Sequence, residues 1–411
     1  MPEFLTLLPP DSAREKLLSQ LTPLGLTSVI ETESALGRVS AEDVLAPHPL
    51  PAFPRTTVDG FAVRSRDTYG VSESLPGYLK LIGEVPMGDT PDFEVGPGQC
   101  AIIHTGGMLP AGADAALMLE YTQTLGDEIE IMKSVADGEN LIRIGEDVAE
   151  GQLVIPRGTR LRPAEIGGLM ALGITKLRVA NKVRVGILSS GDEVIPAGET
   201  PRPGQVRDIN AHTLGTLVTQ SGGEPLQYGI IRDDFAALQA AAARALGECD
   251  LVLITAGSSA STRDMTADVI NTLGKPGVLV HGINTRPGKP TILGLCDGKP
   301  LIGLPGNPVS ALVNGYMMVV PLIEKLLGQL PRQRPSIRAT LTVNLPSMAG
   351  REDWWPVKLR AEGDSQGSLL AEPIFGKSNL IFSLAAADGL LKIPPHATGL
   401  SAGTVVEVLL I

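Results

Sequence analysis

Between Lys182 and Gly328 the sequence alternates short apolar runs with longer amphipathic ones. The apolar runs "KVRVGILSS", "EPLQYGII" and "CDLVLITAG" have the length and composition of buried strands. The stretches "INAHTLGTLVTQSG", "DDFAALQAAAARALGE" and "DMTADVINTLG" have the spacing of amphipathic helices. Strands that are apolar throughout and alternate with such helices are typical of a mostly parallel sheet covered on both faces. We therefore expect a doubly wound α/β domain in this part of the chain.

Charged side chains follow the predicted strands in four loops, "SSGDEV", "IIRDD", "TAGSSASTRD" and "TRPGKP". In a parallel sheet, ligands bind beyond the carboxyl ends of the strands, where these loops would meet. Carboxylates there could hold Mg²⁺, which bridges phosphate oxygens, and cations could offset the remaining negative charge. The candidates are Glu193, Asp233 and Asp264 for the metal, and Arg286 and Lys289 for the anion.

Two strand-to-helix turns add small or rigid residues at the same predicted edge. In the first turn, small residues would leave backbone N–H groups open to a phosphate at the start of a helix. The second turn, "GLPGNP", is either a binding loop or a stiff connection in which Asn307 caps the next helix. The same ambiguity applies to Asp233 and Asp234, one of which could cap a helix. The turn residues in question are Gly257, Ser258, Ser259, Pro305, Gly306, Asn307 and Pro308.

Outside this domain, the pattern of residues differs between the segment before it and the segment after it. "DSAREKLLSQL" predicts a helix that Asp11 could cap, and residues 44–158 consist of short apolar runs cut by Gly and Pro, which indicates a β-rich domain. "RPAEIGGLMALGI" predicts a second helix. After the Pro- and Arg-rich linker "QLPRQRPSIR", short strands predict a small β-barrel or sandwich.

Composition excludes several classes of function. A net charge of −11 and an aromatic content of 3% argue against a nucleic-acid partner. The 3 cysteines are far apart, so neither a disulfide nor a structural zinc site is expected. The start of the chain lacks the pattern of a secretory signal, and runs such as "YMMVVPLI" are shorter than the ~20 residues of a membrane span. We expect a soluble, cytoplasmic protein without a membrane partner.

Taken together, the motifs resemble those of the molybdopterin molybdenumtransferase family, the MoeA-type proteins that include the C-terminal domain of gephyrin. "VDGFAV", "IIHTGGMLPAGADA", "IGEDV", "SSGDEV", "IIRDD", "RPGKP", "GLPGNPVSA" and "NLIFSLAAADGLLKIP" occur in the order of that family. The resemblance implies an elongated four-domain chain. Its parts would be a helical/β segment (1–45 and 148–180), a β-rich inserted domain (46–147), a MogA-like α/β molybdopterin-binding domain (181–328) and a C-terminal β-barrel (335–411).

The resemblance also implies an activity and a shared site. The family cleaves adenylylated molybdopterin with release of AMP and inserts molybdate into the dithiolene, with Mg²⁺ as helper. Members are homodimers, and a molybdopterin adenylyltransferase is the expected upstream partner. The β-rich domain of one subunit would offer Asp59, Thr105 and Asp147 to the α/β domain of the other. The α/β domain would supply Glu193, Asp233, Asp264, Lys289, Pro305 and Pro308.

The chain departs from the family pattern at several positions. Family members commonly have Gly-Gly-Val-Ser-Val-Gly-Asp where this sequence has Ala256 to Thr262, and Val58 replaces the usual Met before Asp-Gly. Because of these changes, tungstate is an alternative to molybdate as the oxyanion substrate. A non-catalytic scaffold is an alternative from another class, and a different phosphate-cleaving enzyme is a third. Retention of the carboxylates as a set favours the insertase.

Overall fold

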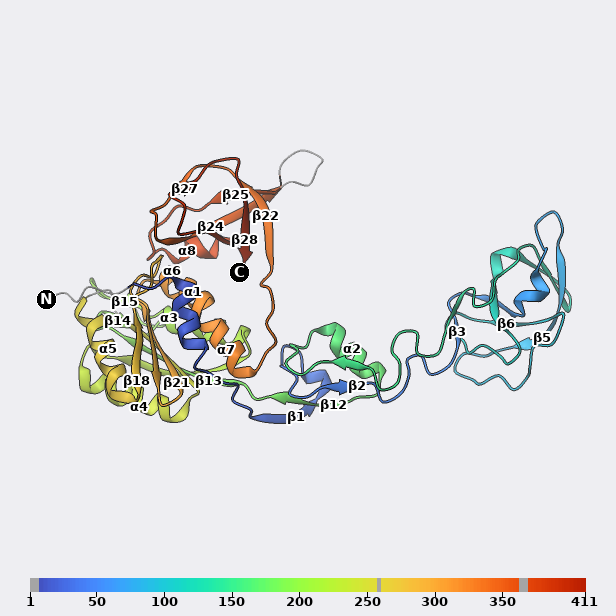
Figure 1. Cartoon of the computed structure of the whole chain (residues 1–411), viewed down its shortest axis with the longest axis horizontal. Helices are drawn as coiled ribbons and strands as arrows, with labels where there is room; N and C mark the ends of the chain where they lie inside the picture. Colours follow the sequence, from blue (N-terminus) through green and yellow to red (C-terminus); the bar gives the residue numbers. More distant parts are fainter. Residues whose placement is uncertain (1–6, 257–259, 362–368) are drawn as a thin grey trace.

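The computed structural model describes residues 7–256, 260–361 and 369–411, and for 260–264 the backbone alone. The molecule is elongated (Figure 1). An α/β unit and a β-barrel lie together at one end, a small mixed unit lies in the middle, and a β-rich unit forms the other end. The chain passes to the β-rich unit and then back through the middle unit. The strands of the α/β unit follow later in the sequence.

The α/β unit is a six-stranded sheet in which four neighbouring strands are parallel and two are antiparallel. In spatial order the strands are β16 (Gly223–Ile231), β13 (Val183–Ser190), β17 (Leu251–Ala256), β21 (Lys299–Pro305), β20 (Ile292–Cys296) and β18 (Pro276–His281). A small pair, β14 (Val194–Ile195) and β15 (Val206–Arg207), lies beside the sheet. The expected doubly wound, mostly parallel sheet is confirmed.

Two separate hydrophobic cores show why this sheet is covered on both faces. Within β17, Leu253 belongs to one core and its neighbours Val252 and Ile254 belong to the other. Successive side chains of a strand point to opposite faces, so a strand that is apolar throughout contributes side chains to both cores. The first core is covered by α3 (Asn210–Gln220), α6 (Pro308–Asn314) and α7 (Val320–Leu327), and the second by α4 (Phe235–Glu248) and α5 (Ala260–Leu273).

One continuous helical run, 308–327, is long and apolar enough to cross a membrane by length and composition. In this fold 67% of an 18-residue window of the run is buried, and side chains such as Val313 and Ile323 belong to the first core. Its apolar character is thus explained by packing inside the α/β unit.

Helix α1 (Pro10–Leu18) also packs against the α/β unit, through Ala13 and Leu17 in the first core. The prediction that Asp11 caps this helix is wrong. The N-cap position is Pro9, and Asp11 lies in the first turn, where its carboxylate pairs with Arg14 at 2.6 Å. Proline fixes a helical φ and is favoured at the first position of a helix, so Pro10 starts the helix before Asp11.

The middle unit is built from short antiparallel pairs, and the sheet of the β-rich unit is antiparallel except for one parallel pair of strands. In the middle unit, β1 (Thr27–Glu31) pairs with β12 (Lys176–Ala180), β2 (Val44–Leu45) pairs with β11 (Leu153–Ile155), and α2 (Pro163–Ala171) covers them. The β-rich unit has a six-stranded sheet and a short pair, β3 (Arg55–Thr56) with β10 (Leu141–Ile142). The sheet order is β7 (Ala115–Met118), β4 (Gly60–Val63), β6 (Gln99–Ile103), β5 (Gly77–Glu84), β9 (Glu128–Ile131), β8 (Thr122–Leu125). The parallel pair is β5 with β6.

The C-terminal unit is a closed barrel, which decides between the barrel and sandwich alternatives. The strands pair in the order β24 (Glu352–Ala361), β25 (Leu369–Pro373), β22 (Ser336–Leu341), β28 (Val405–Leu410) and β26 (Gly389–Ile393), and β26 pairs back to β24. A short strand of the α/β unit, β19 (Thr285–Arg286), adds to β24 in parallel. The barrel is therefore joined to the α/β unit by backbone pairing.

Candidate functional site

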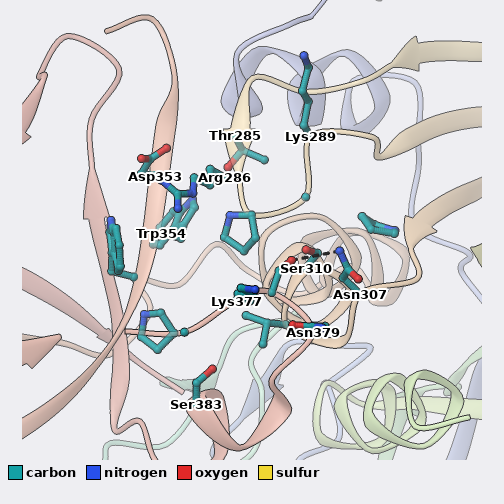
Figure 2. Close-up of a pocket in the computed structure, with 18 of the residues that line it drawn as sticks. Thr285, Arg286, Lys289, Asn307, Ser310, Asp353, Trp354, Lys377, Asn379 and Ser383 are labelled. Atoms are coloured by element: carbon teal, nitrogen blue, oxygen red, sulfur yellow. Dashed lines mark hydrogen bonds between the residues drawn. The ribbon is translucent and has the colours of Figure 1, made fainter. Parts of the chain in front are cut away.

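A cavity of about 670 Å³ lies between the α/β unit and the barrel (Figure 2). Two of its walls come from the α/β unit, namely the turn 285–290 after β19 and the segment 305–310 where β21 passes into α6. The other two come from the barrel, namely 351–356 at the start of β24 and the segment 374–383 that leads into α8 (Ile381–Ala385). The cavity therefore borders the carboxyl end of a parallel strand, where ligands of such sheets bind.

The cavity is positively charged, although the whole chain carries a net charge of −11. Four cations line it: Arg286, Lys289, Arg351 and Lys377. Among the described residues, Asp353 is the single carboxylate in the lining. In Figure 2 Arg286 lies near Asp353 and Trp354, whereas Lys289 extends away from Lys377 and Asn307. The excess of cations over carboxylates in the lining favours an anionic ligand.

The turn "RPGKP" that carries Arg286 and Lys289 is held by a buried amide. Gly288 has φ +100°, and a Cβ there would overlap the Asn314 side chain. Asn314 Nδ2 donates to Gly288 O at 3.1 Å and to Thr291 Oγ1 at 2.7 Å. Asn314 lies inside the apolar run of α6, which is why sequence reasoning did not single it out.

Residues of the barrel wall were also missed by sequence reasoning. Asp353 is fully buried and accepts two hydrogen bonds from Arg351, at 2.6 and 2.9 Å. The Arg286 guanidinium lies 5.5 Å from the centre of the Trp355 ring, a cation–π geometry. The pattern "GREDWW" offered a signal, because two carboxylates inside a strand that contains two tryptophans need partners.

The predicted residues of "GLPGNP" lie at this cavity. Pro305 and Asn307 line it, and Gly306 and Pro308 are their chain neighbours. Asn307 occupies the N-cap position of α6, but its side chain makes no cap hydrogen bond. Its Nδ2 donates instead to Ser378 Oγ at 3.1 Å, across the junction to the barrel.

Carboxylates gather at the far side of the same sheet edge. Asp233 Oδ1 accepts from Ser190 Oγ at 2.7 Å, and its backbone N–H donates to Asp192 Oδ1 at 3.3 Å. Glu193 follows directly, on the same loop as Asp192. Asp234 caps α4, because its Oδ1 accepts from Ala237 N at 2.8 Å. Asp234 is therefore the helix cap, and the ligand role predicted for Asp233 stays a prediction.

The carboxylates and the cavity lie along one edge of the sheet. Ser189 in β13 pairs with Thr255 in β17, and Ala256 pairs with Pro305 in β21. Adjacent strands are ~4.8 Å apart, so the ends of β13 and β21 are separated by about 10 Å. The predicted residues Gly257, Ser258 and Ser259 lie outside the described residues, as does the side chain of Asp264.

A buried amide near the middle of this edge is a further residue that sequence reasoning missed. Asn210 begins α3 and is 8% exposed. Its Nδ2 donates to Gly306 O at 2.8 Å, and its Oδ1 has no hydrogen-bond partner among the described residues. Nearby Asp208 is also buried and accepts from Ala211 N at 3.1 Å. "RDIN" before a predicted helix was the available signal.

Asp59 and Thr105 form a separate contact on the β-rich unit. Thr105 N donates to Asp59 Oδ1 at 2.8 Å. This hydrogen bond, the Thr105 hydroxyl and nearby His104 lower the pKa of the Asp59 carboxyl, so it is ionised at neutral pH. The unit lies at the opposite end of the chain from the cavity (Figure 1). Asp147 lies where the chain returns to the middle unit, and it borders a small pocket beside α2.

Comparisons with known proteins agree with this division of the chain. Residues 8–173 match the MoeA N-terminal region (domain I and II), and residues 186–325 match a probable molybdopterin binding domain. Residues 338–411 match the MoeA C-terminal region (domain IV). The three matches cover nearly all of the chain.

Relatives and solved structures resemble the chain over most of its length. The molybdopterin molybdenumtransferase of Haemophilus influenzae is 36% identical, and the alignment covers 84% of each chain. That of Bacillus subtilis is 32% identical over 94% of this chain and 90% of the relative. A crystal structure of the molybdopterin biosynthesis MoeA protein from Pyrococcus horikoshii OT3 is 32% identical, with a TM-score of 0.85 over 99% of this chain and 100% of that one.

The order of units, the barrel and these matches define a protein of molybdenum cofactor biosynthesis. The chain belongs to the MoeA family, to which these transferases also belong. The family expected from the motifs is confirmed.

Replacing Asp234 by Ala removes the cap of α4 and should lower the free energy of unfolding by about 1 kcal/mol. Asp233→Ala is the matched control one residue away, and it should leave the helix capped. Urea unfolding followed by circular dichroism measures both variants. An equal loss in the two variants would contradict the assignment of the cap.

Asn314→Ala should destabilise the chain by about 1–3 kcal/mol, because buried Gly288 O and Thr291 Oγ1 each lose a donor. Asn379→Ala, on the exposed rim of the cavity, should change stability by less than about 0.5 kcal/mol. Thermal unfolding of the two variants tests the difference. If both variants unfold at the same temperature as the wild type, Asn314 does not hold the turn.

Proposed function

We propose that this chain is a molybdopterin molybdenumtransferase. It would take adenylylated molybdopterin, cleave the phosphoanhydride bond with release of AMP, and place molybdenum from molybdate in the dithiolene. One observation carries the proposal: the cationic cavity and the carboxylates of Glu193 and Asp233 lie along one edge of a parallel sheet. The names of the relatives support the same activity.

The cavity is proposed as the oxyanion site. Its four cations oppose one carboxylate, which suits a tetrahedral dianion such as molybdate or tungstate. Because the carboxylate, Asp353, is bound by Arg351, it neutralises only part of the positive charge. About 670 Å³ exceeds what an oxyanion needs and leaves room for the dithiolene end of the pterin. We propose molybdate as the natural substrate, with tungstate as its competitor in the test below.

The carboxylate side of the edge is proposed as the phosphate and metal side. No group of three or more His, Cys, Asp or Glu that could hold a metal occurs among the described residues. Mg²⁺ often binds through one or two carboxylates together with water and substrate phosphates. Glu193 and Asp233, with Asp264 as a third candidate, fit that mode. Bound Mg²⁺ would offset charge on the phosphoryl oxygens.

The chain's own residues have separate proposed tasks. Asp233, held by Ser190, keeps a fixed carboxylate at the phosphate. Arg286 and Lys289 offset charge that develops on the oxyanion or the leaving phosphate. The nucleophile is water or an oxygen of molybdate, and the bond that breaks is the one that frees AMP.

The site includes a second copy of the chain in this proposal. Asp59 and Thr105 are at the opposite end of the molecule from the cavity, so they reach a cavity only in a partner (Figure 1). A homodimer would bring the ionised Asp59 carboxylate to the α/β unit of its partner. We further propose that the dimer works in the cytoplasm and receives its substrate from an adenylyltransferase.

AMP release from adenylylated molybdopterin, with Mg²⁺ and either molybdate, tungstate or neither, tests the proposal. We expect molybdate to stimulate release. Lys377→Ala should raise the molybdate concentration for half-maximal release about tenfold, because a charge-assisted contact is lost. Asn379→Ala, another cavity residue without charge, is the control.

Three outcomes would overturn parts of the proposal. Stronger stimulation by tungstate than by molybdate would make tungstate the natural substrate. Absence of AMP release from the folded chain under all three conditions would favour a scaffold. Cleavage of simple dinucleotides, with no effect of either oxyanion, would favour a different phosphate-cleaving enzyme.

A further inference from the structure

A small pocket of about 250 Å³ lies where the middle unit meets the α/β unit. One wall is formed by residues 158–165 of the middle unit, and the other by residues 329–332, which follow α7. From there the chain runs to β22 of the barrel, on the side of the α/β unit that faces the middle unit (Figure 1). We call this the junction pocket. It shares no lining residue with the cavity of the candidate site.

The two walls of the junction pocket are joined by close backbone contacts. Leu330 N donates to Gly158 O at 2.9 Å. Gly158 has φ +86°, and a Cβ there would lie 2.7 Å from Gly328 O. Any other residue at position 158 would be strained and would push the walls apart, so the approach of the two segments depends on glycine.

Arg160 reaches from the middle unit to the α/β unit. Its Nη2 donates to Gln220 O at 2.6 Å, at the C-terminal end of α3. This is the one hydrogen bond of the Arg160 side chain among the described residues, although a guanidinium carries five N–H donors. Burial lowers the pKa of this guanidinium, nearby Glu324 raises it, and nearby Arg332 lowers it further. Arg160 is therefore half-buried, has donors to spare and lies close to a second cation.

The lining of the junction pocket has more positive than negative charge. Its charged residues are Arg160, Arg162, Glu165 and Arg332. Arg162 Nε donates to both carboxylate oxygens of Glu165, at 3.1 and 3.0 Å, so this pair is internally neutral. In the part of the chain that the structure describes, the Arg332 side chain makes no hydrogen bond or ion pair, and Glu324 is ion-paired with neither Arg160 nor Arg332. Two guanidinium groups thus line one small pocket without a carboxylate bound to either.

We infer that the junction pocket binds an oxyanion group with the size and charge of phosphate, held between Arg160 of the middle unit and Arg332 of the connection to the barrel. A planar guanidinium can donate to two phosphate oxygens at once, which a lysine cannot do with the same geometry. The volume of about 250 Å³ compares with about 30 Å³ for one water, so such a group enters with several waters.

A bound oxyanion would also fix the orientation of the middle unit. Arg160 and Arg332 belong to different parts of the molecule, so an anion that contacts both stabilises the arrangement in which they are close. The chain reaches the β-rich unit through the middle unit, so the direction of that unit would follow (Figure 1). The inference is independent of the proposed activity, because no residue of the candidate site lines the junction pocket.

Isothermal titration of the folded chain with inorganic phosphate tests the binding. All chains would carry Lys377→Ala, which weakens anion binding in the other cavity. Arg332→Met should raise the Kd for phosphate about tenfold, because a charge-assisted contact is lost. Arg157→Met is the matched control, since Arg157 is exposed in the same turn as Arg160 but does not line the pocket. Equal Kd values for the Arg332→Met chain and the control would overturn the inference.

A second titrant separates two sources of the oxyanion group. AMP carries a phosphate group of the same chemistry on a larger molecule. Binding of phosphate that is tighter than binding of AMP would identify a free oxyanion as the ligand, and the reverse order would identify a nucleotide. In either case the binding must depend on Arg332, and binding of both titrants that ignores Arg332→Met would overturn the site.

Distances between two spin labels test the effect on orientation. The labels would be placed at Met170→Cys on α2 of the middle unit and Ala240→Cys on α4 of the α/β unit, both exposed positions. The natural cysteines Cys100, Cys249 and Cys296 are buried, so the introduced thiols are the accessible ones. Labelled chain would be diluted with unlabelled chain, so that distances within one copy dominate.

Phosphate should narrow the distribution of distances between these labels. The Arg332→Met chain should keep a broad distribution with and without phosphate, while Arg157→Met should behave like the parent chain. An unchanged distribution in a chain that binds phosphate would overturn the bridging of the two units by the anion.

Discussion

The pairing of β19 with β24 joins the barrel to the α/β unit, and the cavity depends on it. Two residues of each strand pair in register, and the partners from the barrel are Glu352 and Asp353, both buried. Glu352 is paired with Lys392 at 2.6 Å, and Asp353 with Arg351. Removing one partner of a buried ion pair costs about 3–5 kcal/mol, because the other charge is left without compensation. Both pairs lie within the barrel, so they hold the start of β24 in the position where β19 pairs with it.

The same arrangement explains how an acidic protein provides a cationic cavity. The net charge of −11 belongs to the chain as a whole, while the turn after β19 and the start of β24 bring their cations to one place. The carboxylates after β13 and β16 lie at the other side of the sheet edge. An anionic substrate with two charged ends would thus meet opposite environments along one edge. The β-rich unit, which is far from this edge in its own chain, is proposed to supply a third group of residues from a second copy.

Much of the fold was predictable from the sequence because it depends on local periodicity. The strands of the α/β unit are apolar throughout, and that pattern predicted a sheet covered on both faces. The loops after its strands predicted Asp233 and the "RPGKP" turn as site residues, since strand ends in a parallel sheet meet at one edge. The short C-terminal strands predicted a barrel or a sandwich, and the family resemblance favoured the barrel and gave the order of the units.

The remaining features depend on contacts between distant segments, which periodicity does not encode. Arg351 and Lys377 line the cavity because the barrel docks beside β19. In sequence, both residues are separated from Lys289 by about the length of a whole small domain. Asn314 supports a turn from within an apolar helix, so its pattern predicts only core packing. Asp11 and Asp234 were both predicted as possible helix caps. Asp234 is one, but Pro10 starts the first helix, so Asp11 lies in its first turn. Residues 257–259 and the side chain of Asp264 lie outside the described residues, so their predicted roles stay predictions.

The central proposal is that each active site is assembled from two copies of this chain. The most direct measurement is AMP release by double-tagged dimers that combine an Asp59→Asn chain with an Asp233→Asn chain. Each variant alone should be inactive, and the mixed dimer should regain about half of the wild-type activity, because one of its two sites contains no substitution. A mixed dimer of Asp59→Asn and Thr105→Val, with both changes on the β-rich unit, should stay inactive. No recovery in the first mixed dimer would contradict the claim.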